Sequence, residues 1–166
     1  MKETPGDLAA LQAVIDASFA VAGPHLASIA QPDHRLSAAQ VAAHLQGMRH
    51  IVLATVSPRG RPLVGPLDAF FLRGRFWATT SADAQRIRHM ETNPNVSAVH
   101  FSGDDFAVTV HGRAMLFRRG DPEIDEIHAI MTDWYKSSPL EWGEIVFIRI
   151  DPEKVHTFAQ HPEQFP

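Results

Sequence analysis

The chain has 166 residues and a mass of 18.4 kDa, and 45% of its residues are hydrophobic, which is enough for one compact domain with a sizeable core. It contains no cysteine, which excludes disulfides, zinc–thiolate sites, iron–sulfur clusters and cysteine nucleophiles. The net charge of −4, the lack of any long apolar run and an N-terminus unlike a signal peptide predict a cytoplasmic protein that interacts with neither a membrane nor a nucleic acid.

Positive charge is concentrated in one part of the chain. Residues 49–88 hold seven arginines and two acidic residues, whereas residues 89–166 hold six basic and thirteen acidic residues. Such a stretch in an acidic protein favours a confined anionic ligand over a long polyanion. An equally good interpretation is that four of these arginines lie on solvated hairpin tips, namely Arg59, Arg61, Arg73 and Arg75.

The N-terminal segment is predicted to be helical. Hydrophobic residues recur at helical spacing from Leu8 to Ile29, and the N-cap is either Thr4 or Asp7. Pro24 is expected to end or kink this helix near residue 23.

A second, short helix is predicted after Ser37, which forms a capping-box pattern with Gln40. The sequence then changes to apolar runs rich in β-branched residues and separated by turn residues. The predicted strands span residues 51–56, 63–72, 75–80, 96–101, 106–117, 145–150 and 155–158. Two helices interrupt them, one capped by Asp83 and ending at Asn93-Pro94, the other running from Asp121 to about Tyr135. About six strands with helices between them predict an α+β domain built around an antiparallel β-barrel.

Several short motifs are informative through their order and spacing. In chain order they are Ile51–Val56, Gly60-Arg61-Pro62, Phe76–Thr80, Gln85-Arg86-Ile87 and Met90–Ser97. Together they resemble the pyridoxamine 5'-phosphate oxidase-like family of FMN-binding split barrels, over residues 37–117 and more loosely over residues 144–160. The resemblance implies a six-stranded split barrel with Greek-key connections. It would be a single domain spanning residues 1–166, with residues 1–36 as a helical extension.

The resemblance also implies a homodimer with two FMN sites at its interface, each lined by both chains. In the family, a threonine at the end of the third strand and a basic pair at the next helix start hold the cofactor phosphate. These roles fall on Thr80 and on Gln85 with Arg86. The chemistry agrees, because Thr79, Thr80 and Ser81 supply hydroxyl donors and the helix start supplies free N–H groups beside the Arg86 guanidinium. Alternatively, this segment is a turn that caps a helix, with Arg86 in solvent.

The family places the flavin ring and ribityl chain along a strand that corresponds here to Pro66, Leu67, Asp68 and Ala69. The sequence departs from the true oxidases at three places. Gly65 and Phe70 replace basic residues, Phe158 stands where a flavin-contacting tryptophan is expected, and the Arg-x-His motif for the substrate's phosphate is missing. We therefore do not expect pyridoxal phosphate synthesis. Phe158 can still stack on the ring edge, so cofactor binding is still expected.

Other kinds of site have little support. Ten histidines show no metal-ligand spacing, so no metal is predicted, and neither a Gly-x-Ser-x-Gly elbow nor a nucleotide-binding glycine loop occurs. Trp134, Tyr135 and Trp142 either cover the substrate side of a flavin pocket or pack a helix onto the barrel.

The preferred function is an FMN-dependent oxidoreductase that passes hydride through the flavin, from a reduced nicotinamide or another donor, to a small organic acceptor. A deazaflavin-dependent reductase of the same fold and a non-catalytic flavin- or haem-binding protein are the alternatives. The sequence identifies no catalytic residue, substrate or electron donor.

Overall fold

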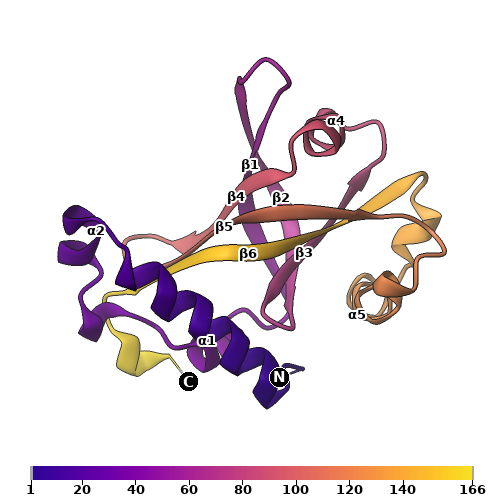
Figure 1. The fold of residues 1–166 in the computed structure, drawn as a ribbon. Helices are drawn as coiled ribbons and strands as arrows, with labels where there is room; N and C mark the ends of the chain where they lie inside the picture. The colour runs from indigo at the N-terminus through magenta and orange to yellow at the C-terminus, as the bar shows by residue number, and fades with distance from the viewer. Residues whose placement is uncertain (1, 166) are drawn as a thin grey trace.

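The computed structural model describes residues 2–165, so the predicted domain limits at residues 1 and 166 lie outside it (Figure 1). The helices are α1 (Pro5–Ala20), α2 (Pro24–Ile29), α3 (Ala38–His44), α4 (Gln85–Thr92) and α5 (Asp125–Tyr135). The strands are β1 (Met48–Val56), β2 (Pro62–Leu72), β3 (Arg75–Ser81), β4 (Asn95–Ser102), β5 (Phe106–Phe117) and β6 (Ile145–Ala159). Short 3-10 helices cover Pro32–His34, Pro122–Ile124, Pro139–Glu141 and Pro162–Gln164. No helix within residues 2–165 is long and apolar enough to cross a membrane.

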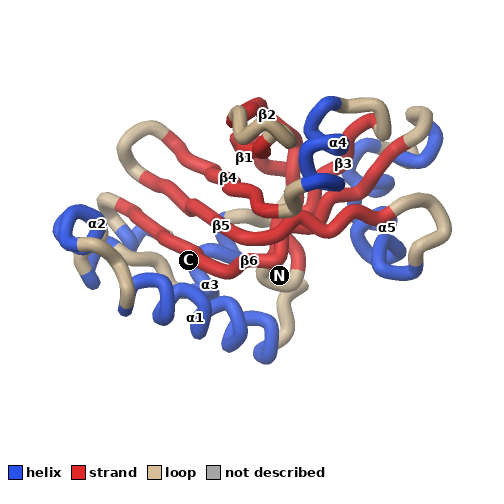
Figure 2. The backbone as a smooth tube through the Cα atoms, turned by 45° about the horizontal axis from the view of Figure 1, so that its top comes forward, coloured by secondary structure: helices blue, strands red, loops and turns tan. Residues whose placement is uncertain are grey.

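The six strands close an antiparallel barrel in the order β1-β2-β3-β6-β5-β4, and β4 pairs back onto β1 (Figures 1 and 2). The β1–β2 hairpin sets the register of the first pair. Ser57 and Arg61 close its tip through a 2.8 Å backbone hydrogen bond, and His50 consequently faces Asp68 across the two strands. The predicted six-stranded antiparallel barrel with flanking helices is therefore confirmed.

The N-terminal helices lie against the barrel near the C-terminal half of β6 (Figures 1 and 2). Thr4 caps α1 and Asp7 completes a capping box, so the two candidate capping residues act together. Pro24 interrupts the helix as predicted: α1 ends at Ala20, and Pro24 begins α2 as its first residue. The apolar face also ends with α1: Leu11 and Ile15 are buried, whereas α2 buries no residue.

The two strands predicted at residues 145–150 and 155–158 are one continuous strand, β6. The Asp151-Pro152 pair does not end the strand, because a β-bulge shifts the register with β5 between His111 and Gly112. A Cβ added at Gly112 would overlap the carbonyl oxygen of Asp151, so only glycine allows this close approach.

Two predicted helix starts also differ from the structure. Asp83 does not cap α4, whose N-cap is Ala84. The Asp83 carboxylate instead accepts a 2.6 Å hydrogen bond from the Ser81 hydroxyl. Before α5, the chain forms a 3-10 helix at Pro122–Ile124, so the α-helix itself begins at Asp125 rather than at Asp121.

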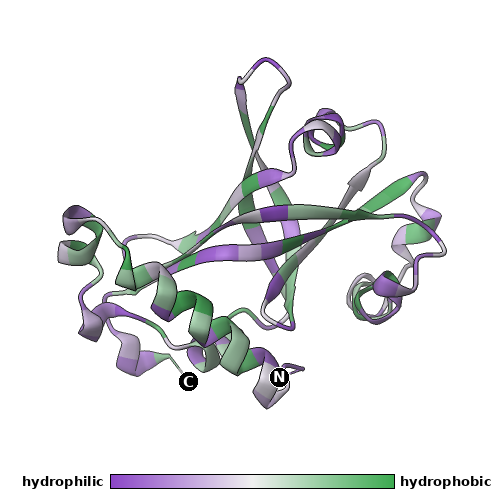
Figure 3. Ribbon diagram, in the orientation of Figure 1, coloured by the Kyte–Doolittle hydropathy of each residue, from purple (hydrophilic) through white to green (hydrophobic). Residues whose placement is uncertain are grey.

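Hydrophobic side chains form two cores, while the hairpin tip and α4 are mostly hydrophilic (Figure 3). The first core fills the barrel and extends to α1, α3 and α4. The second lies between the barrel and α5 and contains Phe70, Leu72, Trp77, Phe117, Ile124, Ile127, Met131 and Phe147. Because side chains alternate between the faces of a strand, Ala69 belongs to the first core and Phe70 to the second. The second core holds α5 beside the strands that carry the predicted cofactor residues.

Candidate functional site

A cavity of about 640 Å³, here called the β2–β3 cavity, collects most of the predicted cofactor residues. Pro66, Leu67 and Asp68 line it from β2, and Thr79, Thr80 and Ser81 line it from β3. The remaining lining residues are His50, Tyr135, Trp142 and Ile145. The β2–β3 and β3–β6 pairings thus bring two segments that are eleven residues apart in sequence to one hollow.

Asp68 joins two side chains at this cavity. One carboxylate oxygen lies 3.3 Å from His50 Nε2, and the other accepts a 3.3 Å hydrogen bond from the Tyr135 hydroxyl. Burial and the adjacent Asp68 carboxylate raise the pKa of Tyr135 to about 12, so its hydroxyl stays protonated at neutral pH. The cavity therefore contains an imidazole, a carboxylate and a phenol in contact.

Arg86 lies beside the cavity in the first turn of α4. Its Nη1 atom donates a 3.4 Å hydrogen bond to the carbonyl of Pro66, which lines the cavity. The guanidinium fits there because residue 65 is glycine: a Cβ at Gly65 would lie 3.2 Å from Arg86 Nη2. Burial lowers the pKa of Arg86, and no carboxylate of residues 2–165 forms an ion pair with it. A half-buried cation without a counter-ion favours an anionic ligand at this position.

Four predicted cofactor residues do not line the β2–β3 cavity. Arg86 lies beside it, and the other three are Ala69, Gln85 and Phe158. The Ala69 side chain is buried in the barrel core, so only its backbone is available to a ligand. Gln85 lines a different groove, between α4 and the β1–β2 hairpin. Phe158 packs edge-on against His34, thirteen residues along β6 from the cavity residue Ile145. At about 3.3 Å per residue this separation is roughly 40 Å along the strand, so Phe158 does not reach the cavity of its own chain.

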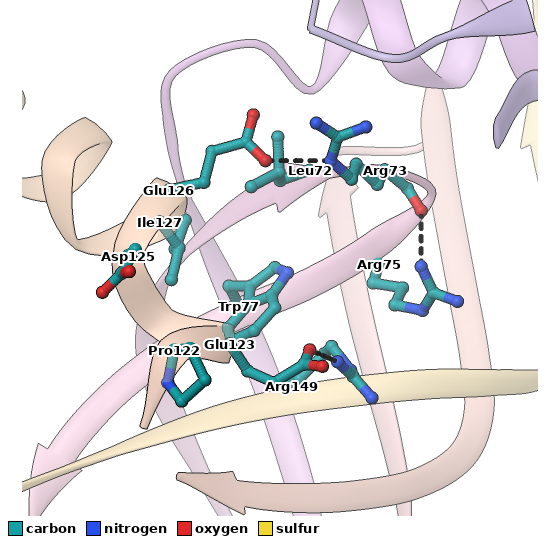
Figure 4. Close-up of a pocket in the computed structure, with 10 residues that line it drawn as sticks. All are labelled: Leu72, Arg73, Arg75, Trp77, Pro122, Glu123, Asp125, Glu126, Ile127 and Arg149. Atoms are coloured by element: carbon teal, nitrogen blue, oxygen red, sulfur yellow. Dashed lines mark hydrogen bonds and ion pairs between the residues drawn. The ribbon is translucent and has the colours of Figure 1, made fainter. Parts of the chain in front are cut away.

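Another hollow, of about 420 Å³, lies between β3, β6 and α5, with Trp77 at its base (Figure 4). Its arginines already have acidic partners. Arg73 Nε lies 2.9 Å from Glu126, and Arg149 lies 2.7 Å from both Glu123 and Asp151. Internal ion pairing leaves this hollow with little net charge for an anionic cofactor. Within residues 2–165, no group of three or more ligand-type side chains is arranged to hold a metal ion.

His50 was not predicted as a site residue, although the sequence contains the necessary signal. The Ser57–Arg61 turn fixes the hairpin register, and counting back along both strands places His50 opposite Asp68. Tyr135 reaches the cavity through the packing of α5 on the second core, and the Trp142 ring packs edge-on against Tyr135, with ring centroids 5.1 Å apart. That contact depends on tertiary structure, and no local pattern distinguishes it from ordinary packing.

Comparison with solved structures shows the same fold. A conserved hypothetical protein from Mycobacterium tuberculosis is 21% identical, with a TM-score of 0.66, over 82% of this chain and 92% of that one. A FAD-binding protein from Mesorhizobium loti is 26% identical, with a TM-score of 0.55, over 74% and 94% of the two chains. A pyridoxamine 5'-phosphate oxidase-related, FMN-binding protein from Nostoc punctiforme is 16% identical, with a TM-score of 0.54, over 67% and 75%.

No match was found among curated protein sequences. The sequence profile of the pyridoxamine 5'-phosphate oxidase family, in contrast, matches residues 37–159. This span begins at the N-cap of α3 and ends at the last residue of β6, so it contains the whole barrel and the β2–β3 cavity. By this match and by its six-stranded barrel, the chain belongs to the pyridoxamine 5'-phosphate oxidase family.

Proposed function

We propose that this chain is an FMN-dependent oxidoreductase that binds its cofactor in the β2–β3 cavity. The observation that carries the proposal is the pairing of this cavity with Arg86, a half-buried cation that lacks an acidic partner among residues 2–165. Membership of the family and the FAD-binding relative from Mesorhizobium loti support a flavin as the ligand.

The phosphate end of the cofactor fits the junction of β3 and α4. The hydroxyl groups of Thr80 and Ser81 and the guanidinium of Arg86 lie within seven residues of sequence, and the first N–H groups of α4 are near them. The Ser81 hydroxyl donates a hydrogen bond to the Asp83 carboxylate, so a bound phosphate would have to compete with Asp83 for this donor. Arg86 would then exchange its 3.4 Å contact with the Pro66 carbonyl for a charge-assisted bond.

The ring end fits the apolar and aromatic side of the cavity. Leu67, Pro66 and Trp142 offer surfaces against which a flat ring can pack. When bound, FMN supplies the ability to accept a hydride from a reduced nicotinamide and to pass it to a small organic acceptor.

His50 is the residue we assign to proton delivery in this site. Imidazole is the side chain best suited to proton exchange near neutral pH, and Asp68 orients it while Tyr135 holds the second carboxylate oxygen. His50 would donate a proton to an acceptor that has received negative charge. It is exposed at the cavity, so it can be reprotonated from solvent.

The proposal is tested on the purified protein by its absorption spectrum and by fluorescence titration with FMN. A flavin spectrum with saturable FMN binding is expected, followed by oxidation of a reduced nicotinamide in the presence of quinones, dyes or nitro compounds. A deazaflavin spectrum would move the assignment to the related reductases, and flavin binding without any turnover would indicate a binding protein. Failure to bind either cofactor would overturn the proposal.

A further inference from the structure

Among the described residues that line the β2–β3 cavity, Asp68 is the only acidic one, and neither a lysine nor an arginine lines it. The Asp68 carboxylate contacts the imidazole of His50 and the phenol of Tyr135. In the hollow of Figure 4, in contrast, Glu123 and Glu126 each pair with an arginine. No lysine or arginine of the described chain therefore neutralises the negative charge of Asp68.

The Asp68 carboxylate also has room for a further hydrogen-bond donor. One oxygen lies 3.3 Å from His50 Nε2, and the other accepts a 3.3 Å bond from the Tyr135 hydroxyl, which is long for an O–H···O hydrogen bond. An ionised carboxylate accepts about four hydrogen bonds, so these two contacts leave part of its capacity unused. The side chain is 50% exposed, and a ligand in the cavity can reach it.

Trp142 supplies an aromatic surface close to this carboxylate. Its ring packs edge-on against Tyr135, with the ring centroids 5.1 Å apart, and Tyr135 is the residue whose hydroxyl contacts Asp68. The indole N–H donates a 3.0 Å hydrogen bond to the Ser137 hydroxyl, which fixes the orientation of the ring. Trp142 lines the cavity and remains about half exposed. A carboxylate beside an indole is suited to an organic cation, because the charge forms an ion pair with one group and a cation–π contact with the other.

We propose that the Asp68 end of the β2–β3 cavity binds a small organic cation, namely an ammonium group carried by a flat apolar body. The ammonium group would lie against Asp68, and the apolar body would pack on Trp142. The opposite preference holds near Arg86, which contacts the carbonyl of Pro66, two residues from Asp68 on β2 and roughly 7 Å away at about 3.3 Å per residue. The cavity thus separates an anion-binding end, suited to the cofactor phosphate, from a cation-binding end, suited to a substrate. The role as substrate rests on the proposed function, whereas cation binding itself does not.

The cation site is tested in the full chain without added flavin by titration with benzylamine, a cation, and with benzyl alcohol, its neutral analogue of similar shape. The titration is followed through the backbone NMR signals of Leu67 and Ser81, at pH 8, where imidazole is ordinarily neutral. Asp68→Asn should weaken benzylamine binding by about fivefold or more and change benzyl alcohol binding by less than about twofold. The matched control is Asp104→Asn, at an exposed carboxylate in the turn between β4 and β5, which should change neither affinity.

A second variant tests the aromatic half of the site. Trp142→Leu keeps an apolar side chain but removes the aromatic ring, so it should weaken benzylamine binding about two- to fivefold more than benzyl alcohol binding. If the wild type binds the two probes equally tightly, or if Asp68→Asn and Asp104→Asn weaken benzylamine binding alike, the cation site is wrong. Asp68 would then serve only to orient His50.

The role of the cation as substrate is tested in the FMN-loaded protein with two dyes of opposite charge. Asp68→Asn should raise the KM for methylene blue, a cation, at least about fivefold more than the KM for anionic 2,6-dichlorophenolindophenol. An equal change in both KM values would show that the acceptor is not selected by its positive charge, even where benzylamine binds. If the wild type reduces neither dye, the result contradicts the proposed function, and the benzylamine titration decides the cation site by itself.

Discussion

Arg86 is the side chain whose removal best tests the phosphate end of the proposed site. A charge-assisted hydrogen bond to phosphate contributes about 1.5 to 3 kcal/mol, so Arg86→Ala should weaken FMN binding by roughly 10- to 150-fold. Riboflavin has no phosphate and should lose little affinity from the same change. Fluorescence titration of both ligands against both proteins measures the difference.

The control for this experiment is Arg113→Ala, which removes an exposed arginine of β5 and should leave both affinities unchanged. If Arg86→Ala weakens FMN and riboflavin equally, or affects neither, the phosphate is bound elsewhere. Arg86 would then serve only to join α4 to β2 through the Pro66 carbonyl.

His44 and His100 give the fold a predictable response to acid. Their rings lie 6.2 Å apart, with Phe106 and Phe165 against His44. Burial lowers the pKa of His44, and the nearby Arg49 and His100 lower it further. Burial also lowers the pKa of His100. A hydrogen bond to the His50 carbonyl opposes this shift, whereas Arg49 and His50 add to it. As the pH falls below the ordinary histidine pKa of 6.5, the unfolded chain therefore binds protons at these two residues more readily than the folded chain does.

The contribution of the two neutral histidines to the free energy of unfolding should consequently be fully present above pH 6.5. It should be lost as the pH falls through their lowered pKa values. The midpoint of urea denaturation measured between pH 7.5 and pH 5 tests this direction. His44→Phe should flatten the dependence, because phenylalanine packs with the same aromatic neighbours and cannot be protonated. His161→Phe, at an exposed position, should leave the slope unchanged. A midpoint that rises on acidification would refute the assignment.

At the scale of the elements, the β5–β6 bulge depends on one glycine. Alanine at position 112 would force its Cβ against the Asp151 carbonyl group, and the two strands would have to separate. Overpacking of this kind costs about 1 to 3 kcal/mol, so Gly112→Ala should lower the free energy of unfolding by at least that amount. The control is Gly6→Ala in the first turn of α1, where the added methyl has room and should be neutral or stabilising. Similar urea midpoints for the two variants would contradict this view of the bulge.

The elements that local chemistry specifies were the ones that the sequence predicted well. The capping box at Ser37 and the turn after Val56 each place their own donors and acceptors within a few residues. The continuity of β6 could not be predicted in this way. Asp151-Pro152 is a typical strand break, and only the opposing Gly112 on β5 shows that the strand continues past it.

At the scale of the whole molecule, we expect a homodimer. The family resemblance implies sites shared between two chains. Trp142, which lines the β2–β3 cavity, is 46% exposed, and Trp134 in α5 is 51% exposed. If Phe158 contacts the flavin, it does so from a second copy, because its own cavity is at the far end of β6. Light scattering at micromolar concentration should give about twice 18.4 kDa. A monomer that retains full FMN affinity would contradict the shared site.

The candidate site could be predicted only in part, because some of its residues come together only in the folded molecule. Pro66 to Asp68 and Thr79 to Ser81 were placed by the family resemblance, and the fold brings both segments to the β2–β3 cavity. His50, to which we assign proton delivery, needed the hairpin register, and Tyr135 needed the packing of α5. Phe158 was placed by analogy with a family tryptophan, and the fold of a single chain puts it elsewhere.

The position of β6 between β3 and β5 also constrains how the protein is made. A ribosome releases the chain from its N-terminus, so β1 to β5 emerge before the strand that joins β3 to β5. Until residues 145–159 have been synthesised, both of those strands present unpaired edges, and the apolar lining of the barrel is open to water. The nascent protein therefore passes its most aggregation-prone stage just before residues 145–159 emerge. A chain cut short in the loop before β6 would remain in that stage, with two open edges available to its neighbours.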